Sequence, residues 1–377
     1  MVSKEKIIEG LKSEEIIIRE AFYRYVCNLH LYDDDEINQA FIEVIKKDYK
    51  VLSYDVLMHS KLNISIIETL INILLIEEKS FIKDYICDIL IEHYNLIKDL
   101  NYDFDEIIRT YDKENKVDLE NELMYKKIKH FSKKNPQELI DLYICNISEY
   151  YLTDKKTLTT ELLRKAIEVA LIQTEEGHEK LKEFAVALKI MLEEEKNDYD
   201  NFYDVHMPYL VYPLCQYGDP KIWFMILELY LMECDFIDYV DYADACNYYF
   251  STICDEKFVN EYIKIIKKIK PKKRAAYHYD IAEFLNSEKI DKFLFEELNK
   301  TKDNNVKENI VRILANRFNK EIIPYVLEGI DKGIFIDIES INIAICPLLL
   351  LEERRDEISK AIIEDVREFR KLIFEYN

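Results

Sequence analysis

The chain has 377 residues, enough for two or three compact domains or for one elongated array of repeats. It contains only 5 glycines and 7 prolines, which disfavours folds that rely on glycine-rich phosphate loops or tight turns, such as Rossmann folds, P-loop folds and β-sandwiches. A net charge of −22 opposes non-specific binding to nucleic acid or anionic lipid, because phosphate groups are repelled at long range. This composition predicts an all-α protein.

The cysteines and the apolar runs indicate where in the cell the protein is expected to reside. The 8 cysteines include no CxxC pair and lie mostly within apolar runs, so we expect reduced, buried thiols in a cytoplasmic protein. The first residues lack the apolar core of a signal peptide. The longest apolar runs, 71–76 and 341–351, are too short for a membrane span of about 20 residues.

Amphipathic helical patterns recur along the N-terminal part of the chain. Apolar residues spaced by three and four predict one helix pair over 13–47 and a second over 63–77 and 80–98. From 101 to 134 the pattern weakens and the charge rises, which indicates a surface loop or an irregular pair. We therefore expect N-terminal helical repeats over 1–100 and a less regular helical segment over 101–200.

Regular patterns return at Asn135-Pro136, where Asn caps a helix and Pro occupies its first position. After a polar break at 196–201, Pro and Gly punctuate the chain more heavily, and C-terminal repeats are expected over 201–377. In total the patterns predict about 18 short antiparallel amphipathic helices in pairs, as in an α-solenoid. The helices expected beyond residue 135 are 137–151, 156–173, 178–196, 220–233, 238–254, 272–286, 288–299, 306–318, 321–329, 338–351 and 354–375.

Three segments resemble the openings of HEAT-type repeats, in which a D-P or N-x-V turn leads into a helix. They are Gly218-Asp219-Pro220-Lys221-Ile222, the run from Asn304 to Ala315, and Ile18-Arg19-Glu20-Ala21. Lys307 stands where the family favours Arg, and the middle of the chain, 100–215, departs from the pattern. The resemblance implies curved surfaces that bind proteins or nucleic acid, without catalysis.

The segment 204–256 differs most from the rest of the chain. It holds ten Asp/Glu against one Lys, together with twelve aromatic residues and four of the cysteines. Tyr and Trp often anchor interfaces, so this segment suggests an acidic, Tyr-rich surface for a basic or amphipathic protein partner. A solvated face over a Tyr-rich core is the alternative. The candidate partner-binding residues are Trp223, Asp235, Asp238, Tyr239, Asp241, Tyr242 and Asp244.

A basic run follows directly, with eight Lys/Arg against one Glu over 257–274. It is the one credible phosphate-contact region, but a solvated helix end is the favoured explanation, because the chain carries a net charge of −22 and Lys is favourable near a helix C-terminus. A third interpretation packs the run against the acidic face of a neighbouring repeat. The candidate phosphate-binding residues are Lys267, Lys268, Lys270, Lys272, Lys273 and Arg274.

Catalytic motifs are not found, and no catalytic, cofactor or metal residues are assigned. Glu175-x-x-His178 matches half of a di-iron motif, but the second half is missing and a solvated histidine at a helix start is favoured. The spacing of His206 and of cysteines 215, 234, 246 and 254 does not suit zinc. We therefore expect a non-catalytic scaffold or adaptor. Nucleic-acid binding through 264–274 and a helical enzyme with an unrecognised site are the alternatives.

Overall fold

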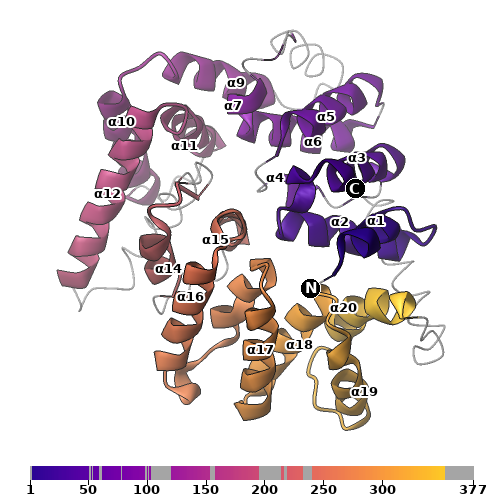
Figure 1. Cartoon of the computed structure of the whole chain (residues 1–377). Coiled ribbons are helices and arrows are strands. Elements are labelled where there is room, and N and C mark those ends of the chain that lie inside the picture. Colours follow the sequence, from indigo (N-terminus) through magenta and orange to yellow (C-terminus); the bar gives the residue numbers. More distant parts are fainter. Residues whose placement is uncertain are drawn as a thin grey trace. The chain divides into compact units, whose positions relative to one another are not determined.

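The computed structural model describes residues 2–50, 120–152, 158–194, 219–231 and 240–352, together with residues 214–215 and most of 52–102. These described residues form α-helices and short 3₁₀ helices and contain no strand, which confirms the all-α prediction (Figure 1). Their contacts define two compact units. Unit 1 combines 1–56 with 250–377, and unit 2 comprises 57–249.

Unit 1 unites the two ends of the chain. α1 and α2 contact one another, α3 contacts both of them, and α2 packs on α20 from the far end of the sequence (Figure 1). Contacts also link α18 with η3, α17 and α20. The elements of unit 1 are α1 (Lys4–Leu11), α2 (Ile16–Asn28), η1 (Leu31–Asp33), α3 (Asp35–Asp48), α16 (Glu256–Lys268), η2 (Pro271–Lys273), η3 (Ala276–Phe284), α17 (Glu288–Lys300), α18 (Asn304–Asn316), η4 (Lys320–Ile322), α19 (Ile323–Asp331) and α20 (Ile338–Leu351).

Unit 2 contains the helices between these two segments. α9 contacts both α6 and α11, and α10 packs against α11 and α12. Two helices, α4 (Asp55–Met58) and α15 (Val240–Ile253), cross the boundaries between the units. The others are α5 (Ile64–Ile76), α6 (Ser80–Glu92), α7 (Tyr94–Ile97), α9 (Glu120–Phe131), α10 (Pro136–Leu152), α11 (Leu158–Leu171), α12 (Glu175–Glu194) and α14 (Trp223–Leu231).

Short polar side chains begin many of these helices. Asp34, Asn63, Asp255 and Asp303 each accept hydrogen bonds from backbone N–H groups in the first turn of the following helix. The N–H groups of a first turn have no partner within the helix, so each such cap contributes about 1 kcal/mol. The expected start at 63 is thereby confirmed.

Buried arginines hold the turns of unit 1. Arg19 pairs with Asp48 through Nε at 2.6 Å and donates to the carbonyls of Ser13 and Glu14. Arg317 pairs with Asp291 at 2.6 Å and donates to carbonyls of the η3–α17 connection. A guanidinium group has five N–H donors in a fixed plane, so one side chain can bind a carboxylate and several carbonyls at once.

The helices α2 and α18 resemble each other beyond their equal length of 13 residues. Both carry Glu, Arg and Asn at intervals of four residues. Two positions after each helix ends, the backbone turns left-handed, at His30 (φ 52°) and at Phe318 (φ 53°). The matching residues are Glu20, Arg24 and Asn28 in α2 and Glu308, Arg312 and Asn316 in α18.

Several expected elements are corrected. The predicted helix over 272–286 is wrong, because η2 and η3 occupy this stretch as 3₁₀ turns. The Ala275 backbone N–H donates to the ring of His278 there, which draws the chain into a tighter turn than an α-helix. The helix expected from 220 begins instead at Trp223. α1 was not predicted, and 120–131, expected to be irregular, is α9.

Two other expectations are not tested by the described residues. The expected helix 354–375 lies outside the described residues. The three segments 1–100, 101–200 and 201–377 stay a prediction. Within the described part of the chain, no helix is long and apolar enough to cross a membrane.

Candidate functional site

The acidic, Tyr-rich surface predicted from the sequence is described only in part. Asp235, Asp238 and Tyr239 lie outside the described residues. Asp241, Tyr242 and Asp244 belong to helix α15, but their side chains are not described. The proposed grouping of these carboxylates therefore stays a prediction.

The described part of this segment exposes an aromatic pair at the start of α14. Phe224 is 46% exposed, and the half-buried ring of Trp223 meets it edge to face with 5.5 Å between centroids. Farther along α14, Ile226 and Leu227 are fully buried. The helix therefore packs through its later residues and leaves the first turn, with its two large rings, at the surface.

The basic run is partly neutralised by carboxylates within unit 1. Lys264 pairs with Glu261 at 3.0 Å, and Lys267 pairs with Glu296 at 3.2 Å. Arg274 is nearly buried against Glu297 and donates to the carbonyls of Ile269 and Lys267 at the end of α16. Arg274 therefore stabilises a helix end rather than facing solvent.

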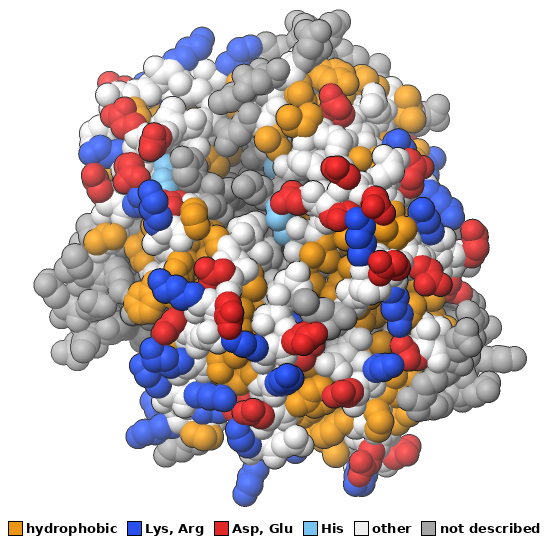
Figure 2. Space-filling view, viewed as in Figure 1, with side chains coloured by type: hydrophobic (Ala, Val, Ile, Leu, Met, Phe, Trp, Pro, Cys, Tyr) orange, Lys and Arg blue, Asp and Glu red, His pale blue; other side chains and the backbone are white. Residues whose placement is uncertain are grey.

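The remaining described cations of the run lie at the surface. Lys268, Lys270 and Lys273 are exposed, whereas the side chain of Lys272 is not described. On the face shown in Figure 2, Lys and Arg side chains gather over α16 and α17 but are interleaved with Asp and Glu. The structure thus places the described lysines of the run at a surface of mixed charge, whereas Arg274 is largely buried.

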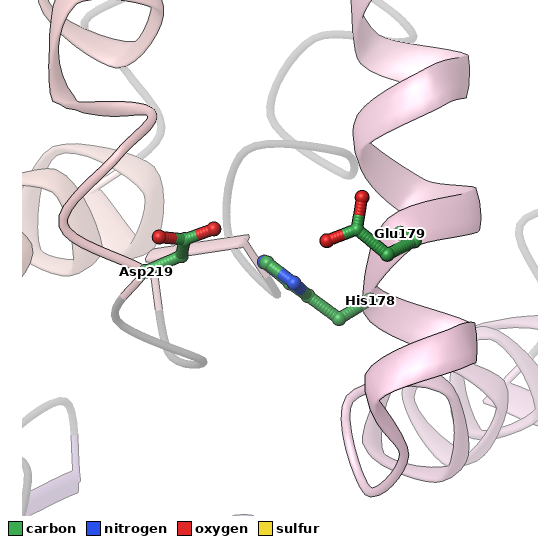
Figure 3. A group of neighbouring side chains, drawn as sticks. All are labelled: His178, Glu179 and Asp219. Carbon is green, nitrogen blue, oxygen red and sulfur yellow. The ribbon is translucent and has the colours of Figure 1, made fainter.

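A second group of ionisable side chains lies in unit 2, where α12 meets the residues before α14. Ligand atoms of His178, Glu179 and Asp219 lie within 4.8 Å of one another (Figure 3). His178 is 1% exposed, so the expected solvated histidine is wrong. Burial and the neighbouring Lys182 lower the pKa of His178, so the ring is neutral at pH 7.

Lys182 already supplies the positive charge between these carboxylates. Its ammonium lies 2.5 Å from Glu179 and 3.4 Å from Asp219, and the hydrogen bond to Glu179 is the main cause that raises the pKa of Lys182. A metal ion would have to displace this ammonium. The group is therefore better explained as a structural ion pair that joins α12 to the residues before α14.

The described cysteines form no disulfide. Cys215 and Cys246 are buried with their sulfur atoms 3.8 Å apart, and burial raises the pKa of the Cys215 thiol. Burial also raises the pKa of Cys254 to about 11. Cys145 is exposed, contrary to the expectation of buried thiols. His206 and Cys234 of the rejected zinc set lie outside the described residues.

A polar cavity of about 350 Å³ lies in unit 1 between α2, η3, α18 and α20. The carboxylate of Glu283 in η3 connects the walls, because it accepts hydrogen bonds from Asn28 at 3.1 Å and from Asn316 at 3.0 Å. Arg312 lies 3.5 Å from the same carboxylate and 3.4 Å from Asp280. One carboxylate thus links the N-terminal helix α2 to the C-terminal helix α18.

Burial raises the pKa of Glu283, although Arg312 and Asn316 oppose the shift. It raises the pKa of Asp280 as well, against Arg312 and Asn309. The remaining polar lining comes from Ser340 of α20 and from Glu20 and Arg24 of α2. The last two pair through Arg24 Nε at 3.3 Å.

Sequence analysis did not identify this cavity. Its polar residues are ordinary surface types, and Glu283 lies in the segment expected to be α-helix. The available signal was the Glu-x₃-Arg-x₃-Asn pattern shared by 20–28 and 308–316. The comparisons do not add an identity: no protein-family model, curated protein or solved structure matches the chain.

Proposed function

We propose that the chain is a non-catalytic, HEAT-like helical-repeat scaffold that binds a protein partner through the segment 204–256. The observation that carries the proposal is the aromatic pair Trp223 and Phe224, because Phe224 remains 46% exposed within the most acidic segment of the chain. Exposed aromatic residues of this kind supply most of the binding energy in many interfaces.

The repeat architecture is supported by α2 and α18. The two helices share length, the spacing of Glu, Arg and Asn, and a left-handed residue at the same position after the helix end. Such recurrence of one helical unit is typical of solenoids, whose antiparallel helix pairs stack to form a continuous core. The absence of disulfides among the described cysteines is in keeping with a cytoplasmic location.

The charge of the segment favours a basic or amphipathic partner. Ten carboxylates against one Lys produce a negative local potential, which steers a basic surface toward the segment and repels phosphate. Binding through these charges weakens as salt rises, because the screening length falls from about 10 Å at 0.1 M to 3 Å at 1 M ionic strength.

Affinity purification from the native cell tests the proposal. We expect a stoichiometric protein partner with the unaltered chain, and its loss with the Trp223→Ala, Phe224→Ala double variant. The triple variant Asp238→Ala, Asp241→Ala, Asp244→Ala should weaken the complex and reduce its dependence on salt. Val186→Ala removes another exposed apolar side chain, 47% exposed on α12, and should retain the partner.

All variants must keep the helical circular dichroism and the melting temperature of the unaltered chain. A partner that remains bound to the Trp223, Phe224 variant would place the interface elsewhere. Recovery of the chain without any protein partner would contradict the scaffold function.

A further inference from the structure

The cavity in unit 1 is lined by both charged and apolar side chains. Its charged lining residues are two carboxylates and two guanidinium groups, Glu20, Glu283, Arg24 and Arg312, so their formal charges cancel. Its volume of about 350 Å³ lies at the lower end of the range of roughly 300–1,000 Å³ found for ligand pockets. The cavity thus suits a small molecule without net charge.

Arg24 provides hydrogen-bond donors that no described residue uses. Its Nε donates to Glu20 Oε1, and neither terminal nitrogen of its guanidinium makes a hydrogen bond within the described part of the chain. The side chain is 46% exposed although it lines the cavity. A guanidinium with two open N–H groups in one plane binds a carboxylate in bidentate fashion.

Asn28 of α2 and Asn316 of α18 provide acceptors beside Glu283. Each amide nitrogen donates to Glu283 Oε1, and this contact fixes the orientation of both amides, because an ionised carboxylate can only accept. The Oδ1 atoms of Asn28 and Asn316 make no hydrogen bond to the protein in the described residues. Two amide oxygens beside the negative charge of Glu283 form a suitable environment for an ammonium group.

Apart from Ser340, the rest of the lining is largely apolar. Tyr25 and Phe318 meet edge to face with 5.3 Å between centroids, and Ile343 and Pro347 of α20 complete this wall. A ligand that places charged groups on Arg24 and the two Asn residues would direct an apolar side chain toward these residues.

From these contacts we propose that the cavity binds a free α-amino acid with an apolar side chain, or a zwitterion of the same size. The carboxylate binds Arg24, and the ammonium binds the amide oxygens of Asn28 and Asn316 beside Glu283. A zwitterion leaves the balanced charge of the lining unchanged, whereas a phosphate dianion would leave uncompensated negative charge. The site is separate from Trp223 and Phe224 and does not depend on the scaffold function.

Calorimetric titration of the full chain with each standard amino acid as the probe tests the proposal. We expect at least one apolar amino acid to bind. The variant Arg24→Met should weaken its binding about tenfold or more, because a charge-assisted bidentate contact is lost. Arg24→Lys keeps the positive charge but lacks the planar pair of N–H donors, so it should give an intermediate affinity. Lys46→Met removes an exposed cation of α3 that pairs with Glu43 and should leave binding unchanged.

Two derivatives of the amino acid that binds most tightly test the contributions of its two charged groups separately. The N-acetyl form lacks the ammonium and the carboxamide form lacks the carboxylate, so both should bind more weakly than the parent. Absence of binding by every amino acid at millimolar concentration, with the protein folded by circular dichroism, would overturn the proposal. So would unchanged affinity in Arg24→Met, or an N-acetyl derivative that binds as well as the parent. The Trp223→Ala, Phe224→Ala variant should bind the amino acid normally.

Discussion

Individual charged residues in unit 1 serve different purposes according to their exposure. Arg317 is 5% exposed and is surrounded by acceptors, whereas Arg312 and Arg24 lie at the wall of the cavity and retain contact with solvent. A buried charge is tolerated when its hydrogen bonds are complete, and removal of one partner leaves the others unsatisfied. The same residue type can therefore stabilise the fold at one position and remain available to a ligand at another.

Replacement of Arg317 should be severely destabilising. Arg317→Met removes the guanidinium from Asp291 and from the carbonyls of Ala282, Leu285 and Ser287, at an expected cost of about 3–5 kcal/mol. Arg317→Lys should recover little, because one ammonium cannot reach acceptors on several sides. Urea unfolding measures the free energy. Lys320→Met, at a side chain 71% exposed, should change it by less than about 0.5 kcal/mol. A similar small effect at Arg317 would contradict the structural role.

The buried carboxyl group of Glu283 should make the free energy of unfolding depend on pH. Burial raises its pKa above the ordinary value of about 4.3, while Arg312, Arg24, Asp280 and Asn316 lie around it. The folded state therefore binds more protons than the unfolded state between the ordinary and the raised pKa. The contribution of Glu283 to the free energy of unfolding accordingly increases as pH falls through that window.

The measurement compares urea unfolding at pH 7 and pH 5. The free energy of unfolding of the unaltered chain, minus that of Glu283→Gln, should be larger at pH 5. Glu296→Gln serves as the contrast, because Lys267 lowers the pKa of Glu296: its contribution is lost only below the ordinary carboxyl pKa of about 4.3 and should change little between pH 7 and pH 5. Equal trends in the two variants would show that burial does not govern Glu283.

At the scale of elements, close helix packing depends on one small residue in α1. A Cβ atom on Gly10 would lie about 2.0 Å from ring atoms of Phe22, which is itself fully buried in α2 and stacked on Phe318. In an exposed helix, Gly→Ala stabilises by roughly 0.5–1 kcal/mol. At Gly10, the ring of Phe22 from α2 occupies the space that a side chain would need.

Gly10→Ala should therefore destabilise the protein by about 1–3 kcal/mol, the usual cost of overpacking a core. The companion change Gly10→Ala with Phe22→Leu should recover part of the loss, because the smaller side chain leaves room for the methyl group. Thermal unfolding followed by circular dichroism measures both. A stabilising Gly10→Ala would show that α1 does not pack closely on α2.

Sequence patterns predicted helices well where caps and apolar periodicity agree. They failed where contacts with residues distant in the sequence determine the backbone conformation. Asn63 and the apolar spacing after it predicted α5 within one residue. The stretch from Pro271 to Phe284 has helical spacing, yet Arg274 binds Glu297 and Tyr262 donates to the His278 carbonyl, and 3₁₀ turns result. α1 was missed although Ser3 caps it, because its apolar stripe is only Ile7 and Leu11.

At the scale of the molecule, unit 1 is assembled from residues at opposite ends of the sequence. Phe22 stacks on Phe318 with 4.4 Å between centroids, and Lys6 pairs with Glu352 across 346 residues of sequence. No local pattern reveals such partners. This is why the cavity could not be predicted, although the apolar periodicity of α2, α18 and α20 around it could be read from the sequence.

A double-mutant cycle of Phe22→Leu and Phe318→Leu tests this assembly. Direct stacking predicts a coupling energy of about 0.5–1.5 kcal/mol, measured by urea unfolding of the two single variants and the double variant. Both replacements keep an apolar side chain, so the left-handed backbone at residue 318 is affected equally in each background. Strictly additive effects would mean that the two rings do not meet.

The hydrogen bond between Asn28 and Glu283 can form only late in the synthesis of the chain. Its two residues are 255 positions apart. Translation at about 5–20 residues per second separates their appearance by roughly 10–50 s. During that interval the apolar side of α2 has no C-terminal partner to cover it. A nascent chain of this protein is therefore most exposed to aggregation through α2 during that interval.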